Sequence, residues 1–105
     1  MSEYIVLLST FPSEDEAEKL GTEMVKKGLV ACVNLVPKIR SIYKWKEKVY
    51  NEEEILLIMK SRKEKSKEII EFINNNHSYE VPEVISLSIS SGSKRYLAWI
   101  DENCG

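Results

Sequence analysis

The chain has 105 residues, of which 43% are hydrophobic and 30% charged, and its formal net charge is -2. This length fits one domain, since domains typically run to about 100–150 residues, so we expect residues 1–105 to form a single domain. The composition is that of a folded protein and excludes wholesale disorder. Fifteen Lys and Arg against seventeen Asp and Glu leave no basic excess, which argues against a nucleic-acid partner.

No apolar run approaches the roughly 18 residues that a membrane-spanning helix needs, so we expect no membrane partner. The opening Met1-Ser2-Glu3-Tyr4 lacks the basic region of a signal peptide. Cys32 and Cys104 make no disulfide framework and are typical of reduced thiols in a cytosol. We interpret Cys104 as an exposed tail thiol.

The first third of the chain predicts a strand followed by a helix. Residues 4–10 form an apolar run rich in strand-forming residues. Ser13 begins a capping box, in which the Glu16 carboxylate would reach back to the start of the helix. Apolar residues then recur at helical spacing, which predicts an amphipathic helix over 13–27, and Gly28 is well placed to end it.

The middle of the chain predicts a long hairpin. Residues 29–36 form a second apolar strand, which we expect Pro37 to end. Residues 39–50 alternate loosely as a strand, and residues 51–53 read as a turn. Residues 54–61 are a third apolar strand, so the two strands that flank the turn should pair.

The last third predicts a helix, a strand and a short helix. Ser61 begins a second capping box before a helix with an isoleucine stripe. Residues 77–83 form a loop, residues 84–90 alternate isoleucine or leucine with serine, and Ser93 can cap a last helix. The order β-α-β-β-α-β plus a C-terminal helix predicts an α+β ferredoxin-like sandwich, with a long β-hairpin and both main helices on one sheet face.

Several of these strands are apolar on both faces. A strand with one wet face should alternate apolar and polar residues, but the strands at 4–8, 29–36 and 55–59 do not. No remaining segment looks long enough to cover the second face, so we expect another copy of the chain to do so in a closed oligomer. The strand at 39–50 is about twice the usual length, and its Trp45 predicts an interface arm.

Few residues point to chemistry, and none forms a catalytic centre. The chain has one histidine and no Cys-x-x-Cys pair, so we expect no enzymatic activity. His77 with a carboxylate such as Glu80 could bind copper, zinc or nickel; the alternative is a loop histidine bonded to backbone or solvent. Cys32 could offer a soft ligand to Cu(I), or be a small buried hydrophobe.

Two basic residues follow the end of the third strand. Lys60 and Arg62 could face an anionic ligand. The alternative is a solvated or salt-bridged rim, which is the commoner arrangement of surface charges.

Several segments stand in an order and spacing typical of one family, over nearly the whole chain. They are Ser9-Thr10-Phe11-Pro12, Leu29-Val30-Ala31-Cys32-Val33-Asn34, Ser41-Ile42-Tyr43-Lys44-Trp45, Lys60-Ser61-Arg62, His77-Ser78-Tyr79-Glu80-Val81-Pro82-Glu83, and Gly92 with Tyr96-Leu97-Ala98-Trp99-Ile100. Together they resemble the CutA divalent-cation-tolerance proteins. The resemblance implies a ferredoxin-like subunit in a tight homotrimer, similar to the PII signalling proteins. It also implies a cytoplasmic protein of metal tolerance, copper above all, with no established enzymatic activity.

The chain departs from the family at positions that concern metal. In the family that the chain resembles, some bacterial members use a first-strand cysteine and two adjacent histidines for copper. Here Ser9 and Asn76 stand at two of those positions, so only His77 carries over. Glu47 stands where many members have glycine in the hairpin, and Ser78 where many have proline.

Two functions follow from the resemblance. The first is a trimer that binds copper or another divalent metal weakly at His77, with Glu80 or an acidic group of a neighbouring subunit. The second is a PII-like sensor or scaffold that binds a small anion or a partner protein. Its inter-subunit cleft would be lined by Lys60, Arg62, Tyr79 and Glu80.

Overall fold

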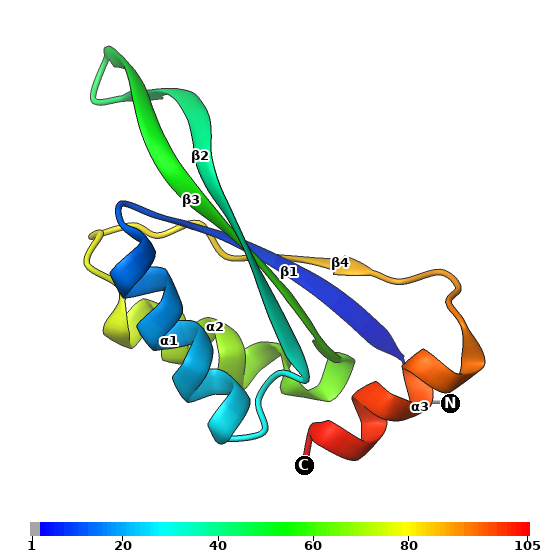
Figure 1. Ribbon diagram of the computed structural model, residues 1–105. Helices are drawn as coiled ribbons and strands as arrows, with labels where there is room; N and C mark the ends of the chain where they lie inside the picture. Colours follow the sequence, from blue (N-terminus) through cyan, green and yellow to red (C-terminus); the bar gives the residue numbers. More distant parts are fainter. Residues whose placement is uncertain (1–2) are drawn as a thin grey trace.

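The computed structural model describes residues 3–105 (Figure 1), and the signal-peptide prediction concerns Met1 and Ser2, which lie outside them. The elements are β1 (Tyr4–Phe11), α1 (Glu14–Lys26), β2 (Cys32–Trp45), β3 (Lys48–Arg62), a 3₁₀ turn (Lys63–Lys65), α2 (Ser66–Asn76), β4 (Ile85–Ser88) and α3 (Lys94–Asn103). The strands form one antiparallel sheet in the order β2-β3-β1-β4. This arrangement confirms the predicted α+β ferredoxin-like sandwich.

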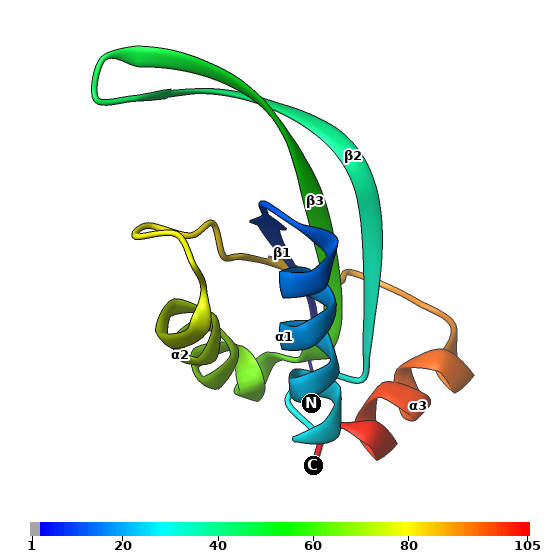
Figure 2. The same ribbon diagram turned by 60° about the vertical axis from the view of Figure 1, so that its left-hand side comes forward.

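The main core lies between one sheet face and two helices. α1 and α2 lie side by side on that face in both views (Figures 1 and 2). Alternate residues of the central strands point into this layer and meet the apolar stripes of the helices. The fully buried members include Leu7, Phe11, Met24, Leu57, Met59, Ile69 and Ile73.

The ends of α1 confirm the predicted helix signals. The Ser13 hydroxyl accepts a hydrogen bond from the Glu16 amide at 3.3 Å. At the other end Gly28 has φ of 72°, which favours glycine. The Leu29 amide then donates to the Met24 carbonyl at 3.0 Å and closes the helix.

The hairpin turn lies nearer the start of the chain than predicted. The structure places it at Lys46 and Glu47, which have φ of 51° and 66°. Two consecutive positive φ values suit the right-handed twist of a hairpin, but asparagine and glycine are the usual residues there. The predicted turn at 51–53 is therefore wrong, and Asn51 pairs with Ile42 inside the ladder.

Pro37 does not end a strand, contrary to prediction. β2 has 14 residues and continues through Pro37 to Trp45, and the register shifts between Val36 and Ile39. Lys38 has φ of 58° at this bulge. A bulge tolerates proline because its residues leave the ladder, where proline cannot donate.

The hairpin of β2 and β3 extends beyond the four-stranded part of the sheet. β1 pairs with β3 only from Ile55 to Arg62, whereas β2 pairs with β3 along nearly its whole length. Residues 39–54 therefore form a two-stranded extension, here called the hairpin arm. Figure 2 shows it curling back over the end of the sheet.

The second predicted capping box is wrong. Ser61 is fully buried, and its hydroxyl donates to the Leu29 carbonyl at 2.6 Å. It therefore joins β3 to the segment before β2. The chain instead makes a 3₁₀ turn after Arg62, and α2 begins at Ser66 without a side-chain cap at Lys65.

The second sheet face is partly covered by α3, which is too short to cover the whole of it. The Tyr4 hydroxyl donates to the Asp101 carboxylate at 2.5 Å, and Ile100 packs in a small separate cluster. Cys104 belongs to this cluster and is fully buried, so its assignment as an exposed tail thiol was wrong. α3 covers only one end of the face (Figure 1).

β4 leaves apolar side chains on the rest of that face. The alternation of residues 84–90 is confirmed for the shorter strand that the structure shows. Leu87 pairs with Val6 and Ile85 with Leu8, so these side chains share the face opposite α1 and α2. Ile85 and Leu87 are each 49% exposed.

None of the helices between residues 3 and 105 combines the length and apolar character that crossing a membrane requires.

Two buried serines give opposite predictions for stability. The buried Ser9 hydroxyl has no hydrogen-bond partner among residues 3–105, whereas the Ser61 hydroxyl donates to the Leu29 carbonyl. Ser9→Ala should raise the free energy of unfolding by about 0.5–1.5 kcal/mol, and Ser61→Ala should lower it by about 1–2 kcal/mol. Urea denaturation of both variants at equal protein concentration measures this. A similar loss in both would show that the Ser9 hydroxyl has a partner.

Candidate functional site

His77 follows the last residue of α2, and its side chain is completely buried. Its Nδ1 accepts a hydrogen bond from the Tyr79 amide at 3.0 Å, and its Nε2 lies 2.8 Å from the Thr10 carbonyl. Because a backbone amide can only donate and a carbonyl only accept, Nε2 carries the proton and the imidazole is neutral. The ring also stacks on Phe11, with centroids 4.3 Å apart.

Glu16 holds the same loop from the side of α1. Its carboxylate accepts from the Ser78 amide at 2.9 Å and from the Ser78 hydroxyl at 2.7 Å. It therefore does not reach back to close the predicted capping box. One carboxylate oxygen also lies 3.5 Å from His77 Nδ1. Glu16 and His77 together fix residues 77–79 against β1 and α1.

This geometry bears on the predicted metal ligand. Both His77 nitrogens are engaged, so a metal ion would have to displace the Tyr79 amide or the Thr10 carbonyl. Within residues 3–105 no group of three or more His, Cys, Asp or Glu side chains is gathered as a metal site. Metal binding at His77 stays a prediction.

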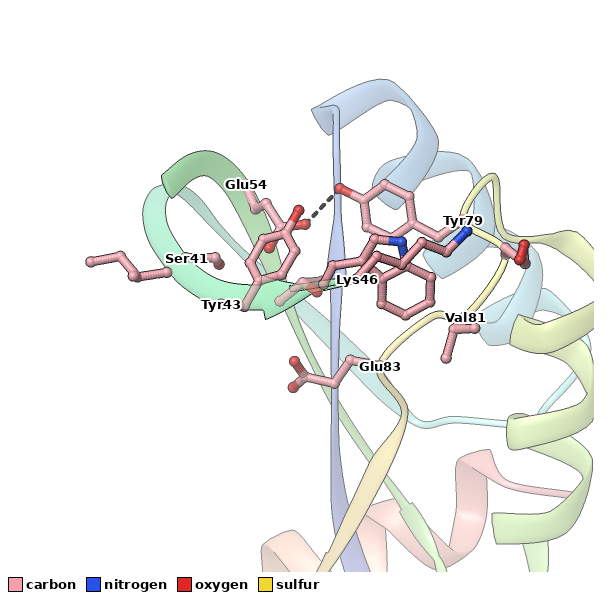
Figure 3. A pocket seen from close by; sticks show the side chains of 11 residues that line it. Ser41, Tyr43, Lys46, Glu54, Tyr79, Val81 and Glu83 are labelled. Carbon is pink, nitrogen blue, oxygen red and sulfur yellow. Dashed lines mark hydrogen bonds between the residues drawn. The ribbon is translucent and has the colours of Figure 1, made fainter. Parts of the chain in front are cut away.

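A cavity of about 560 Å³ lies between the hairpin arm and residues 79–83 (Figure 3). The buried end of the arm meets the end of β1 there. Aromatic and acidic side chains dominate the lining, which comprises Thr10, Ser41, Ile42, Tyr43, Trp45, Lys46, Glu54, Tyr79, Glu80, Val81 and Glu83. The structure thus brings Tyr79 and Glu80 of the predicted site together and adds Glu54.

Two tyrosines of the cavity donate to carboxylates of β3. The Tyr79 hydroxyl donates to Glu54 at 2.6 Å, and the Tyr43 hydroxyl donates to Glu52. Burial and the Glu54 carboxylate raise the pKa of Tyr79 well above the ordinary value. The hydrogen bond to Glu52 raises the pKa of Tyr43 to about 12. Both phenols therefore stay protonated over the physiological range.

Lys60 and Arg62 lie at the far end of β3 from this cavity. Glu54 and Lys60 are six positions apart, which corresponds to about 20 Å of strand. Lys60 donates to the Asn34 side chain, and Arg62 donates to the Cys104 carbonyl at 3.0 Å. Within one chain these residues do not meet Tyr79 and Glu80, so a cleft that joins all four needs a second chain and stays a prediction.

Cys32 begins β2 and is only partly buried, less than the alternative of a small buried hydrophobe expects. Its Sγ lies 3.7 Å from the Asn34 amide oxygen. Burial first, and then the Cys32 thiol, raise the pKa of Tyr96 on α3. The thiol thus lies beside α3, away from His77, and the two do not form a common site within the described chain.

Sequence reasoning missed Glu54 and Glu16 as parts of the site. Glu54 reads as the polar start of an apolar run, and Glu16 as a helix cap. The run of acidic residues 52–54 beside an aromatic strand was the available signal. The sequence instead predicts a turn at 51–53, because the real turn, at Lys46 and Glu47, lacks glycine and asparagine.

The tyrosine contacts predict a late alkaline titration. A phenol whose folded pKa is raised contributes its stability fully below the unfolded pKa of 10.0 and loses it as pH rises through the folded pKa. Tyrosinate absorbance should therefore show a component near pH 12, which Tyr43→Phe removes. Tyr79→Phe should remove a still later component. Loss of amplitude near pH 10 in either variant would contradict the two hydrogen bonds.

Comparison with known proteins places the chain in a family. A chloroplastic CutA protein of Arabidopsis thaliana is 45% identical over 91% of this chain, which spans about half (53%) of that relative. The divalent-cation tolerance protein CutA of Thermus thermophilus is 39% identical over 95% of this chain and 97% of its own length.

Structure leads to the same family. The crystal structure of CutA1 from Oryza sativa superposes with a TM-score of 0.95 at 38% identity, covering 98% of this chain and 94% of its own. The sequence model described as CutA1 divalent ion tolerance protein matches residues 5–103. This protein therefore belongs to the CutA1 divalent ion tolerance family.

Proposed function

We propose that this chain is a single CutA-like domain that acts, without catalysis, in tolerance and homeostasis of divalent metal ions, copper above all. The observation that carries the proposal is the match to the divalent ion tolerance family over residues 5–103. A relative of nearly the same length, from Thermus thermophilus, is named for divalent-cation tolerance.

The proposed metal binding is weak and involves His77 with a carboxylate. The engaged imidazole supports weak binding, because a metal would first break a hydrogen bond of 2.8 or 3.0 Å. Glu16 already lies 3.5 Å from Nδ1. Glu80, or a carboxylate of a neighbouring subunit, would complete the ligand set, since imidazole and carboxylate suit Cu(II) and Zn(II).

The proposed assembly is a homotrimer. Its support is the sheet face that α3 leaves uncovered, where Val36, Ile85 and Leu87 are exposed. An apolar sheet face of this kind is covered in stable proteins. The hairpin arm adds further exposed apolar residues, Ile42 and Val49. A closed symmetric assembly covers both on every copy.

The proposed location is the cytoplasm. Cys32 and Cys104 are both free thiols, and thiols persist in reducing compartments.

Titration with Cu(II) tests the metal proposal. His77→Ala should weaken Cu(II) binding by about tenfold or more, because the only imidazole of the chain is lost. His77→Phe provides a second variant that keeps the ring stacked on Phe11, and its thermal melting reports whether the fold survives. Isothermal titration with unchanged Cu(II) affinity in a folded His77→Phe protein would reject this site.

Sedimentation tests the assembly. The wild-type chain should sediment at about three times its 12.1 kDa mass. Leu87→Asp should shift the distribution toward single chains, because it charges the uncovered sheet face. Val25→Asp is the matched control, since Val25 is 42% exposed on α1, on the other side of the sheet. A stable 12.1 kDa wild-type species at micromolar concentration would reject the proposal.

A further inference from the structure

The cavity beneath the hairpin arm contains a buried carboxylate without a counter-charge. Glu54 is only 5% exposed. It accepts one hydrogen bond, from the neutral Tyr79 hydroxyl (Figure 3), and no Lys, Arg or His among residues 3–105 lies within ion-pair distance of it. A buried carboxylate is costly unless a cation or several donors compensate it. Glu54 thus lines the cavity with a carboxylate that can still pair with a cationic group.

The walls around Glu54 are aromatic. Tyr43, Trp45 and Tyr79 all line the cavity. Aromatic faces carry negative electrostatic potential and attract ammonium groups within about 6 Å of the ring centroid. The chain shows this contact itself, since the Lys46 ammonium lies 5.7 Å from the centroid of the Trp45 ring.

The electrostatic sign of the cavity favours cations. Glu54, Glu80 and Glu83 line it against the single cation Lys46. Hydrogen bonds and charge from β3 carboxylates also help to raise the pKa values of Tyr43 and Tyr79. An anion would meet this negative field, so the cavity by itself does not suit the anionic ligand considered from the sequence.

The residues that line the cavity suit an organic cation better than a bare metal ion. A divalent metal ion needs several oxygen, nitrogen or sulfur ligands around it. Three glutamates line the cavity, but the part of the chain that the structure describes has no three acidic, His or Cys side chains placed so that they could hold a metal ion. Aromatic walls suit the aliphatic stem and the ammonium head of an amine instead.

We propose that this cavity binds a small organic amine, whose ammonium group pairs with Glu54 and whose aliphatic stem lies against Tyr43, Trp45 and Tyr79. Its volume of about 560 Å³ is ample for such a molecule. The proposal is independent of the role in metal tolerance.

Isothermal titration of the full-length chain, in buffer with a chelator, tests this ligand class. Putrescine, a dication on a short aliphatic stem, is the probe. Butanediol has the same stem without charge, and succinate has the same stem length with two negative charges. Putrescine should bind at least about tenfold more tightly than either, because only it compensates Glu54.

Variants of the cavity sharpen the test. Glu54→Gln keeps an acceptor for the Tyr79 hydroxyl but removes the charge, and should weaken putrescine binding by about tenfold or more. Lys46→Asn removes the competing cation at a position of positive φ, which asparagine tolerates. It should tighten putrescine binding by roughly two- to fivefold. Glu18→Gln, at an exposed position of α1, is the matched control and should leave affinity unchanged.

Each outcome of these titrations either supports or overturns the amine proposal. No putrescine binding by the wild-type chain, or tighter binding of succinate, would overturn the proposal. Equal putrescine affinity in the Glu54→Gln and Glu18→Gln proteins would do the same. Should Glu54→Gln fail to fold, Lys46→Asn and Trp45→Leu decide it, since one should tighten and the other weaken binding. Because a chelator is present, failure here leaves the Cu(II) result unaffected.

Discussion

The unequal lengths of the strands that flank β3 determine much of this molecule. β3 has 15 residues and pairs with β2 along nearly all of them, whereas β1 has only 8 residues to offer. Beyond Ile55 the sheet has no third strand, so the hairpin continues alone and its twist curls it back (Figure 2). The cavity, the buried Glu54 and the exposed arm all arise at this point.

Within one chain, helices cover one face of the sheet completely and the other face only in part. α1 and α2 cover one face and build a continuous core around residues such as Leu57 and Ile69. α3 covers one end of the other face and leaves Ile85 and Leu87 exposed. The single chain therefore buries the apolar side chains of one sheet face fully and those of the other face only in part. This partial burial is the physical basis for proposing a trimer.

Hydrogen bonds of the His77 imidazole and the Glu16 carboxylate hold the loop after α2 in place. His77 donates to the Thr10 carbonyl and accepts from the Tyr79 amide, while Glu16 accepts from Ser78. These contacts hold Tyr79 where its hydroxyl meets Glu54. The one histidine of the chain thus shapes the cavity, because it positions the loop that carries Tyr79.

The sequence by itself predicted the element order, the fold class, the family and most helix ends. Those features depend on local signals, such as the Ser13 cap, Gly28 and the apolar runs, which act within a few residues. Its errors also have local causes. A positive-φ turn at Lys46 and Glu47 has no sequence signal without glycine or asparagine, and the sequence predicts a stop at Pro37 because a bulge leaves no clear pattern.

Only the tertiary structure decided which of the candidate residues meet. The sequence names His77 and Tyr79, but their partners Glu16 and Glu54 lie 61 and 25 positions away along the chain. The sequence groups Lys60 and Arg62 with Tyr79 and Glu80, yet they lie at the opposite end of β3 from Glu54, which Tyr79 contacts. Contacts between distant segments depend on strand register and helix packing, and no short stretch of sequence encodes these.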